Sequence, residues 1–272
     1  MAVEEITQNA LKALLYEVVT NPKPGLVDPL DVGSHPDMNV YLFIDSSLSL
    51  RDYFNQAAKI GANFKQNDLQ VMFKLLRQEG IKAEKAMFNA TNRVNTHKGA
   101  VFSLGLFVCA SSYCQQHGGD EFVVIQKMTK GIVKHDLGQK QDTAGEKQFL
   151  QYGKGGVRAE AEAGYPLVRD VALPFLAQTH GELNVRLLDT LMKIVSEIED
   201  SNLIKRAGNI EVIKWAHKQA NRYLNLGGYG TPAGKQFMEE LNQIFKERNY
   251  SLGGSADLLI ITIFMALQRG II

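Results

Sequence analysis

Residues 84–106 read EKAMFNATNRVNTHKGAVFSLGL, and this stretch decides how the chain folds. Apolar residues recur at helical spacing before Thr91 and again in the apolar run 100–110, which predicts a helix on either side. Between them, residues 95–99 supply an amide, a hydroxyl, an imidazole, an ammonium and a glycine. Polar groups at the start of a buried helix suit an anion or a nucleotide, because the free amides and the helix dipole point toward it.

Helical periodicity continues along the rest of the chain. The Asn21–Gly25 segment stops a first amphipathic helix, and Asp68 caps another that Gly80 is expected to end. After Pro166 the spacing is helical again, and Pro174 is expected to kink or break that helix. Further helices are predicted over 81–91, 99–116, 122–135, 143–152, 183–199, 210–226, 232–248 and 256–268, with Ser255 as the cap of the last. No segment alternates with period two, so the predicted class is all-α, with about ten or more helices.

Composition narrows the class of protein. With 272 residues, 45% of them hydrophobic, the chain can bury a large core, and a single catalytic domain over 1–272 is expected. The net charge of +1 argues against a nucleic-acid binder. The most apolar windows are shorter than the roughly 20 residues of a membrane-spanning helix, so no membrane association is expected. Two cysteines, Cys109 and Cys114, and an N-terminus without a basic secretory region favour the cytoplasm.

Five polar clusters interrupt the helical pattern, all at predicted helix ends. They cover residues 21–38, 84–99, 156–166, 199–208 and 251–257. Taken singly, each has a structural interpretation as a helix stop, a cap or a surface pair such as Arg158 with Glu162. Together they repeat acid, amide and base beside glycine, which favours a ligand site. The chain has no Walker A, GxGxxG, GxSxG or HExxH motif, so a phosphate site must be built differently.

The motifs in these clusters resemble those of a known family. They are Pro22–Asp28, Gly33–Met38, Val94–Gly99, Glu160–Pro166 and Gly253–Leu259, in this order along nearly the whole chain. The chain resembles the triphosphoribosyl-dephospho-coenzyme A synthase family, which makes the prosthetic-group precursor of citrate lyase and has a malonate decarboxylase counterpart. The resemblance implies that the 2′-hydroxyl of 3′-dephospho-coenzyme A attacks C1 of the ATP ribose. Adenine leaves, and the triphosphate stays on the sugar.

Four positions depart from the family pattern, and one of them, Ser201 in place of the usual threonine, keeps the hydroxyl. Arg93 and Ala207 stand where the family usually has glycine, and Leu252 stands where it usually has proline. Alanine at 207 matters if that turn is left-handed, because only glycine adopts positive φ freely. We expect these departures to affect substrate preference more than reaction type.

The implied reaction suggests roles for particular residues. Displacement at an anomeric carbon needs a carboxylate near C1 and a hydrogen-bond or proton donor for adenine. The catalytic candidates are Glu84, His97, Glu160 and Asp257. The candidates for binding ATP and its phosphates are Lys23, Asn95, Thr96, Lys98, Gly99, Arg158, Asn202, Arg206, Gly254 and Ser255. Mg²⁺ is the expected cofactor, because it offsets triphosphate charge, and Asp28 and Asp37 are its candidate ligands.

The expected partners follow from the same resemblance. ATP and 3′-dephospho-coenzyme A are the substrates, and the product goes on toward the acyl carrier subunit of citrate lyase. A helical enzyme of this size often dimerises, so a homodimer is considered. Two alternatives stay open: a metal-dependent hydrolase of ADP-ribose or another nucleotide, and a non-catalytic nucleotide-binding module of a lyase complex. Adenine release that requires the acceptor distinguishes the synthase from both.

Overall fold

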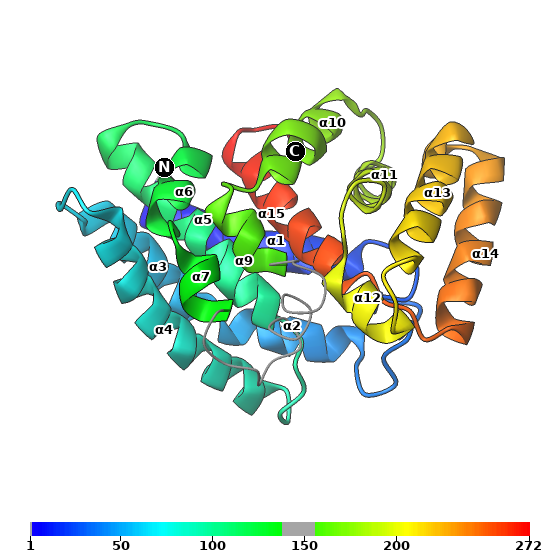
Figure 1. Ribbon diagram of the computed structural model, residues 1–272, viewed down its shortest axis with the longest axis horizontal. Coiled ribbons are helices and arrows are strands. Elements are labelled where there is room, and N and C mark those ends of the chain that lie inside the picture. The colour runs from blue at the N-terminus through cyan, green and yellow to red at the C-terminus, as the bar shows by residue number, and fades with distance from the viewer. Residues whose placement is uncertain (1, 138–155) are drawn as a thin grey trace. The chain divides into compact units, whose positions relative to one another are not determined.

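The computed structural model describes residues 2–137 and 156–272, which form helices and no strand (Figure 1). This confirms the all-α prediction with more than ten helices; the predicted helix 143–152 lies outside the described residues. The α-helices in these ranges are α1 (Val3–Val19), α2 (Val40–Ser49), α3 (Arg51–Asn63), α4 (Leu69–Ala90), α5 (Lys98–His117), α6 (Glu121–Met128), α7 (Ile132–Leu137), α9 (Gly156–Glu162), α10 (Leu173–Gln178), α11 (Leu183–Val195), α12 (Ser201–Ala207), α13 (Val212–Asn225), α14 (Pro232–Glu247) and α15 (Gly253–Gln268). A π-helix (η1, Val168–Ala172) and a 3-10 helix (η2, Gly228–Gly230) complete the set.

The chain divides into two compact units. Unit 1 comprises Met1–Leu14 and Ile44–Pro166, and unit 2 comprises Leu15–Phe43 and Leu167–Ile272. The single domain expected over 1–272 stays a prediction.

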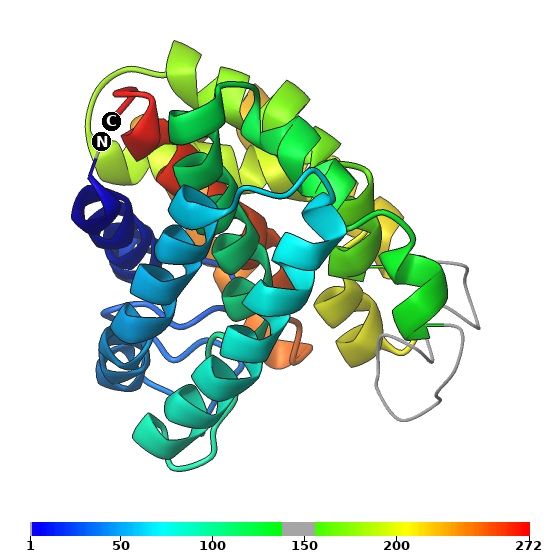
Figure 2. The ribbon, with the colours of Figure 1, turned by 90° about the vertical axis from the view of Figure 1, so that its left-hand side faces the viewer.

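Unit 1 is built around α5. Nearly every side chain of α5 from Ala100 to Ser112 is buried, as expected for a helix that is apolar on most sides. It contacts α3, α4, α6 and α9, and Figures 1 and 2 show α3, α4 and α5 side by side. Two glycines allow the close approach of α3 to α5. A Cβ at Gly61 would overlap the carbonyl oxygen of Cys109, and one at Gly105 would overlap the hydroxyl of Tyr53.

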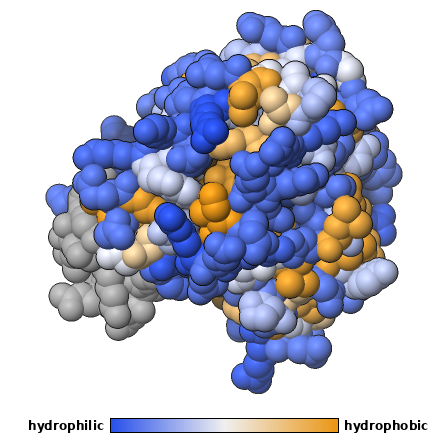
Figure 3. Space-filling view, turned by 90° about the vertical axis from the view of Figure 1, so that its right-hand side faces the viewer, coloured by the Kyte–Doolittle hydropathy of each residue, from blue (hydrophilic) through white to orange (hydrophobic). Residues whose placement is uncertain are grey.

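Unit 2 is built around α15. Residues from Leu258 to Ala266 are buried on all sides of this helix, which contacts α10, α11, α12 and η1. The amphipathic helices α13 and α14 pack against each other and keep polar residues outside. The face of the protein in Figure 3 is accordingly mostly hydrophilic, with separate hydrophobic areas.

Several predicted helix ends are wrong. α4 runs through Gly80 to Ala90, because an interior glycine costs only about 1 kcal/mol and burial of Met87 favours the longer helix. The predicted helix 122–135 is two helices, separated by a turn in which Gly131 has φ 80°. α15 begins at Gly253 with Leu252 at the cap position, so Ser255 lies inside the helix. Pro174 does not break the helix: residues 166–178 are helical without interruption, and the irregularity before Pro174 is the π-helix η1, which continues directly into α10.

Among the described residues, no helix combines the length and the apolar character that crossing a membrane requires.

Candidate active site

The turn between α4 and α5 brings polar residues to the start of the buried helix α5. Asn92 and Arg93 both have positive φ, 51° and 68°, so the chain reverses in the left-handed region. Arg93 thus occupies a conformation that glycine adopts without steric cost, which explains why the related motif has glycine there. The Thr91 hydroxyl anchors the turn with a 2.8 Å hydrogen bond to the carbonyl of Met87. Asn95 Oδ1 then accepts the first helical amide, that of Lys98, at 3.3 Å.

His97 lies buried at the cap position of α5. Its ring Nδ1 is 2.7 Å from the hydroxyl of Ser46, which in turn accepts a 2.7 Å hydrogen bond from the hydroxyl of Thr96. The His97 amide donates to the sulfur of Met87 at 3.2 Å, and its carbonyl accepts the amide of Val101 at 2.8 Å. The Ser46 hydroxyl therefore links the side chains of two predicted residues, Thr96 and His97. Sequence reasoning missed Ser46, because it lies 51 positions before His97 on another helix.

A cation and a carboxylate lie beside this turn. Lys98 Nζ is 3.2 Å from Glu84 Oε2, and both side chains keep partial exposure. The backbone amide of Gly99 has no acceptor within the described part of the chain, as is normal in the first turn of a helix. The three residues are all predicted site residues. Glu84 and Lys98 therefore lie beside the free amide of Gly99 and the positive end of the α5 dipole.

Glu160 and Arg158 lie on α9, which packs on α5, α6 and α7 in unit 1. Burial raises the pKa of Glu160, and its Oε2 is buried without a hydrogen-bond partner among the residues described. Arg158 does not pair with Glu162; its Nε is 3.2 Å from Asp136 Oδ2, and Arg77 holds the other oxygen of Asp136 at 2.9 Å. Burial thus makes the ionised form of Glu160 less favourable than that of an exposed glutamate, whereas Arg158 already has an internal anion.

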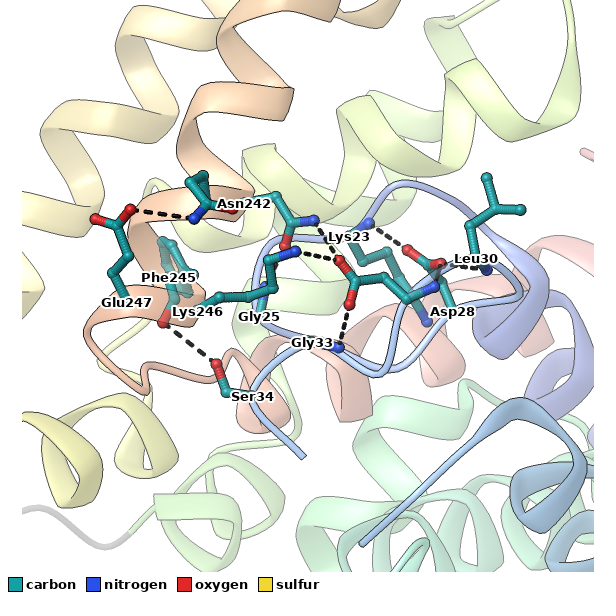
Figure 4. Close-up of polar contacts among 12 residues, drawn as sticks. Lys23, Gly25, Asp28, Leu30, Gly33, Ser34, Asn242, Phe245, Lys246 and Glu247 are labelled. Atoms are coloured by element: carbon teal, nitrogen blue, oxygen red, sulfur yellow. Dashed lines mark hydrogen bonds and ion pairs between the residues drawn. The ribbon is translucent and has the colours of Figure 1, made fainter. Parts of the chain in front are cut away.

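In unit 2, the loop that carries the first motif folds around Asp31 and around Asp28, which is labelled in Figure 4. Asp28 accepts the amide of Lys23 at 3.1 Å with one oxygen and the amides of Leu30 and Asp31 at 2.8 and 2.9 Å with the other. Asp31 ties the loop to α14 through Asn242 and Lys246. The two oxygens of Asp28 therefore hold the loop in shape.

The predicted phosphate ligand Lys23 is buried. Its side chain is 1% exposed, and Nζ donates to a carboxylate oxygen of Glu17 at 2.5 Å and to the Glu17 carbonyl at 2.6 Å. A buried ammonium needs such a partner, because an uncompensated charge is costly away from water. Lys23 therefore serves as an internal cation in this structure.

Asp200 connects the starts of α12 and α15. Its Oδ1 accepts the amides of Asn202, Leu203 and Gly254 at 2.9, 3.2 and 3.3 Å, and its Oδ2 accepts the amide and the hydroxyl of Ser255, both at 2.8 Å. A side chain at Gly254 would meet this carboxylate, so glycine permits the contact. Asn202, Gly254 and Ser255 are predicted ligands of ATP or its phosphates, and their backbone amides donate to Asp200.

Asp257 lies one turn further along α15 and is half-buried. Burial, together with the nearby carboxylates of Asp200 and Glu17, raises its pKa to about 8. No hydrogen bond of its side chain is found in residues 2–137 and 156–272. Asp257 therefore carries a proton at neutral pH.

Arg206 joins three segments of unit 2. It donates to the carbonyl of Ser34 at 3.0 Å, to Asn249, and to His35 Nδ1 at 3.1 Å. Since arginine only donates, the His35 proton is on Nε2, which lies 2.9 Å from the hydroxyl of Ser251. Burial and the Arg206 charge lower the pKa of His35 to about 4, so the ring stays neutral.

The neighbouring departure at position 207 has a simple explanation. Ala207 ends α12 in helical conformation, and the left-handed residue is Gly208 with φ 71°. The glycine that the turn needs is therefore present, and alanine costs no strain at 207.

The predicted metal ligands do not form a closed cage. Within the described ranges, no three His, Cys, Asp or Glu side chains are grouped so that they could hold a metal ion. Asp28 is occupied by backbone amides, whereas Asp37 is exposed.

The fold and these clusters define an all-helical protein with polar groups at helix starts and, in each unit, a carboxyl group whose pKa burial raises. Over residues 3–271 the chain matches the CitG family model, described as ATP:dephospho-CoA triphosphoribosyl transferase. It is 53% identical over 279 residues to a probable 2-(5''-triphosphoribosyl)-3'-dephosphocoenzyme-A synthase of Lactiplantibacillus plantarum, and the match covers 100% of both chains. It is 52% identical to Protein CitXG of Leuconostoc mesenteroides subsp. cremoris, covering 99% of this chain and 60% of that protein.

A probable 2-(5''-triphosphoribosyl)-3'-dephosphocoenzyme-A synthase of Citrobacter koseri is 40% identical over 94% of this chain and 88% of its own length. No solved structure matches the chain. The chain belongs to the ATP:dephospho-CoA triphosphoribosyl transferase family. The predicted family and reaction, triphosphoribosyl transfer from ATP to dephospho-coenzyme A, are confirmed.

Proposed function

We propose that the start of α5 acts on ATP in this reaction, with His97 at the adenine and Lys98 at the triphosphate. The observation that carries the proposal is the grouping of a buried imidazole, a partly exposed ammonium and a free helix amide in consecutive residues. The α5 dipole adds a favourable field for anions. Asn95 and Thr96 complete this cluster as residues that shape the turn.

The proposed reaction exchanges one bond at C1 of the ATP ribose for another. The bond between C1 of the ribose and N9 of adenine breaks, and a bond forms between C1 and the 2′-oxygen of dephospho-coenzyme A. The acceptor hydroxyl loses a proton, and adenine gains a proton or a hydrogen bond as it leaves. We assign the donor role to His97 and keep Glu84, Glu160 and Asp257 as the candidate carboxyl groups.

Environment suggests different roles for these three acids. Asp257, with a pKa of about 8, is protonated at neutral pH and suits a general acid. The raised pKa of the buried Glu160 suits a group that exchanges protons in the reaction. Glu84 pairs with Lys98 and suits a role in placing that ammonium.

The phosphate ligands are proposed in order of availability. Lys98 and the Gly99 amide come first. The Lys98 side chain is partly exposed, and the Gly99 amide has no acceptor among the described residues. The other candidates have internal partners and would need to exchange them for phosphate. They are Lys23, Arg158, Asn202, Arg206, Gly254 and Ser255.

We further propose that Mg²⁺ enters with ATP. Mg²⁺ is usually held by one or two carboxylates together with substrate phosphates and water. The exposed Asp37 fits that arrangement, and Asp28 fits it less well because amides occupy both of its oxygens. When bound, Mg²⁺ would offset part of the triphosphate charge.

We also propose that the product passes toward the acyl carrier subunit of citrate lyase, with malonate decarboxylase as the second destination. We propose further that the enzyme acts in the cytoplasm and that it forms a homodimer. The relatives' names support the precursor synthesis from which the first proposal follows. Size-exclusion chromatography with light scattering tests the dimer, and transfer of the product to a purified acyl carrier subunit tests the destination.

Adenine release tests the reaction and the role of His97 together. The enzyme is incubated with ATP and Mg²⁺, with and without 3′-dephospho-coenzyme A, and adenine is quantified. We expect adenine only with the acceptor, and its loss in His97→Gln and Glu84→Gln at unchanged melting temperature. Adenine or phosphate without the acceptor would indicate a hydrolase, and neither product a binding module. Normal turnover in a variant would remove that residue from the mechanism.

A further inference from the structure

The His97 ring has polar support from a helix outside the motif. Ser46 lies on α2 and is fully buried, and its hydroxyl is 2.7 Å from His97 Nδ1. Thr96 donates to the same hydroxyl at 2.7 Å. All three residues belong to unit 1. Two hydroxyl groups and one ring nitrogen therefore form a short chain that ends on the imidazole.

The direction of this chain determines where the His97 proton lies. Ser46 receives the hydroxyl proton of Thr96, so its own proton is available to His97 Nδ1. With Nδ1 as acceptor, the neutral imidazole carries its proton on Nε2. In the reverse direction the Thr96 proton would have no acceptor among the side chains and carbonyls that the structure describes. The first direction gives both hydroxyl protons an acceptor and leaves the imidazole proton on Nε2.

We propose that Ser46, itself oriented by Thr96, is a positioning residue that holds His97 in the Nε2–H tautomer during triphosphoribosyl transfer. The proposal rests on the role assigned to His97 above. A ring in this tautomer can donate a hydrogen bond to a leaving base, and the other tautomer cannot do so from the same nitrogen. Ser46 does not contact substrate in this role; it acts through the ring.

The first test is direct observation of the tautomer. The full-length enzyme is labelled with ¹⁵N-histidine, and the His97 signals are assigned by their loss in His97→Gln. We expect the wild type to show an unprotonated Nδ1 and a protonated Nε2. Ser46→Ala should shift both signals toward a tautomer mixture. Ser49→Ala is the matched control, because its hydroxyl lies on the same helix but donates to the Ser46 carbonyl at 2.7 Å.

The second test separates positioning from folding. Ser46→Ala should lower kcat on the order of 10-fold with little change in KM for ATP, since one hydrogen bond behind an acid–base group is lost. Thr96→Val should lower kcat in the same direction, and Thr96→Ser, which keeps the donor, should restore it. Melting temperatures of Ser46→Ala and Ser49→Ala should agree closely.

Three outcomes would overturn the inference. They are an unchanged Nδ1 signal in Ser46→Ala, a kcat equal to that of Ser49→Ala, and a Thr96→Ser variant as slow as Thr96→Val. Normal turnover by His97→Gln would instead contradict the proposed function. The tautomer signals would still report whether Ser46 fixes the tautomer of the His97 ring. Failure of the proposed function and failure of the positioning role are therefore distinguishable.

Discussion

One carboxylate oxygen of Asp200 accepts both the backbone amide and the hydroxyl of Ser255, each at 2.8 Å. The other oxygen accepts amides at the starts of α12 and α15. Helix starts leave amides without intrahelical acceptors, and here one buried side chain satisfies those of two helices. The Gly-Gly-Ser motif is therefore closed by an internal anion.

Asp200→Ala should destabilise the protein by about 3 kcal/mol or more, because it removes a cap and leaves several buried donors without an acceptor. Asp200→Asn should have a smaller effect, since it keeps one acceptor oxygen. Asp68 is the matched control: it caps α4 at the surface through the amide of Gln70, and its alanine variant should lose about 1 kcal/mol. Urea unfolding measures all three, and equal losses at positions 68 and 200 would contradict the role of Asp200.

Asp257 should make stability fall as pH rises toward 8. Its pKa is raised from 3.8 in the unfolded chain to about 8 in the folded protein, so the folded state binds the proton more tightly. Folding is therefore favoured at low pH, and this contribution is lost between roughly pH 4 and 8. The stability of Asp257→Asn relative to the wild type should therefore rise between pH 6 and pH 9, by on the order of 3 kcal/mol. The same difference at both pH values would show that Asp257 does not titrate in this range.

Gly61→Ala should destabilise unit 1, because the added methyl group would overlap the backbone of Cys109 on α5. Overpacking against backbone costs about 1–3 kcal/mol. Gly80→Ala is the control within a helix: its nearest atom would be the Tyr53 hydroxyl at 3.7 Å. That change should be neutral or stabilising by up to about 1 kcal/mol. Thermal melting separates the two variants, and a destabilised Gly80→Ala protein would contradict this packing.

Arg93→Gly should be more stable than Arg93→Ala by about 1 kcal/mol, because the position has a φ of 68°. Both variants lose the exposed arginine side chain, so their difference isolates the backbone. Chemical denaturation measures it. Equal stability would mean that the turn adopts a different conformation in solution.

Lys98→Ala should raise KM for ATP by roughly 10-fold, as expected when one charge-assisted contact to phosphate is lost. Its ion pair with Glu84 is partly exposed, so stability should change by less than about 1 kcal/mol. Lys82→Ala removes a similar pair with Glu79 on α4 and should leave KM unchanged. Steady-state kinetics at varied ATP would contradict the assignment if both variants behaved alike.

The sequence indicated the helices well where the signal was local. The period of apolar residues and the Asp68 cap depend on neighbours in the chain, and the structure confirms them. Gly80 was wrong as a stop because tertiary burial on the same helix outweighs its weak local cost. The His97 cluster was also predictable, because its members are consecutive.

The sequence by itself determined the helical class, the two buried helices α5 and α15, and the family with its reaction. Only the tertiary structure decided which motif residues are already bonded to partners inside the protein. Lys23, Asp200 and Arg206 bond to internal partners, and Arg206 reaches His35 across 171 positions. Ser46 joins His97 in the same way, from a helix with no motif of its own. Burial and hydrogen bonding between distant segments are collective properties of the folded chain, so local spacing could not report them.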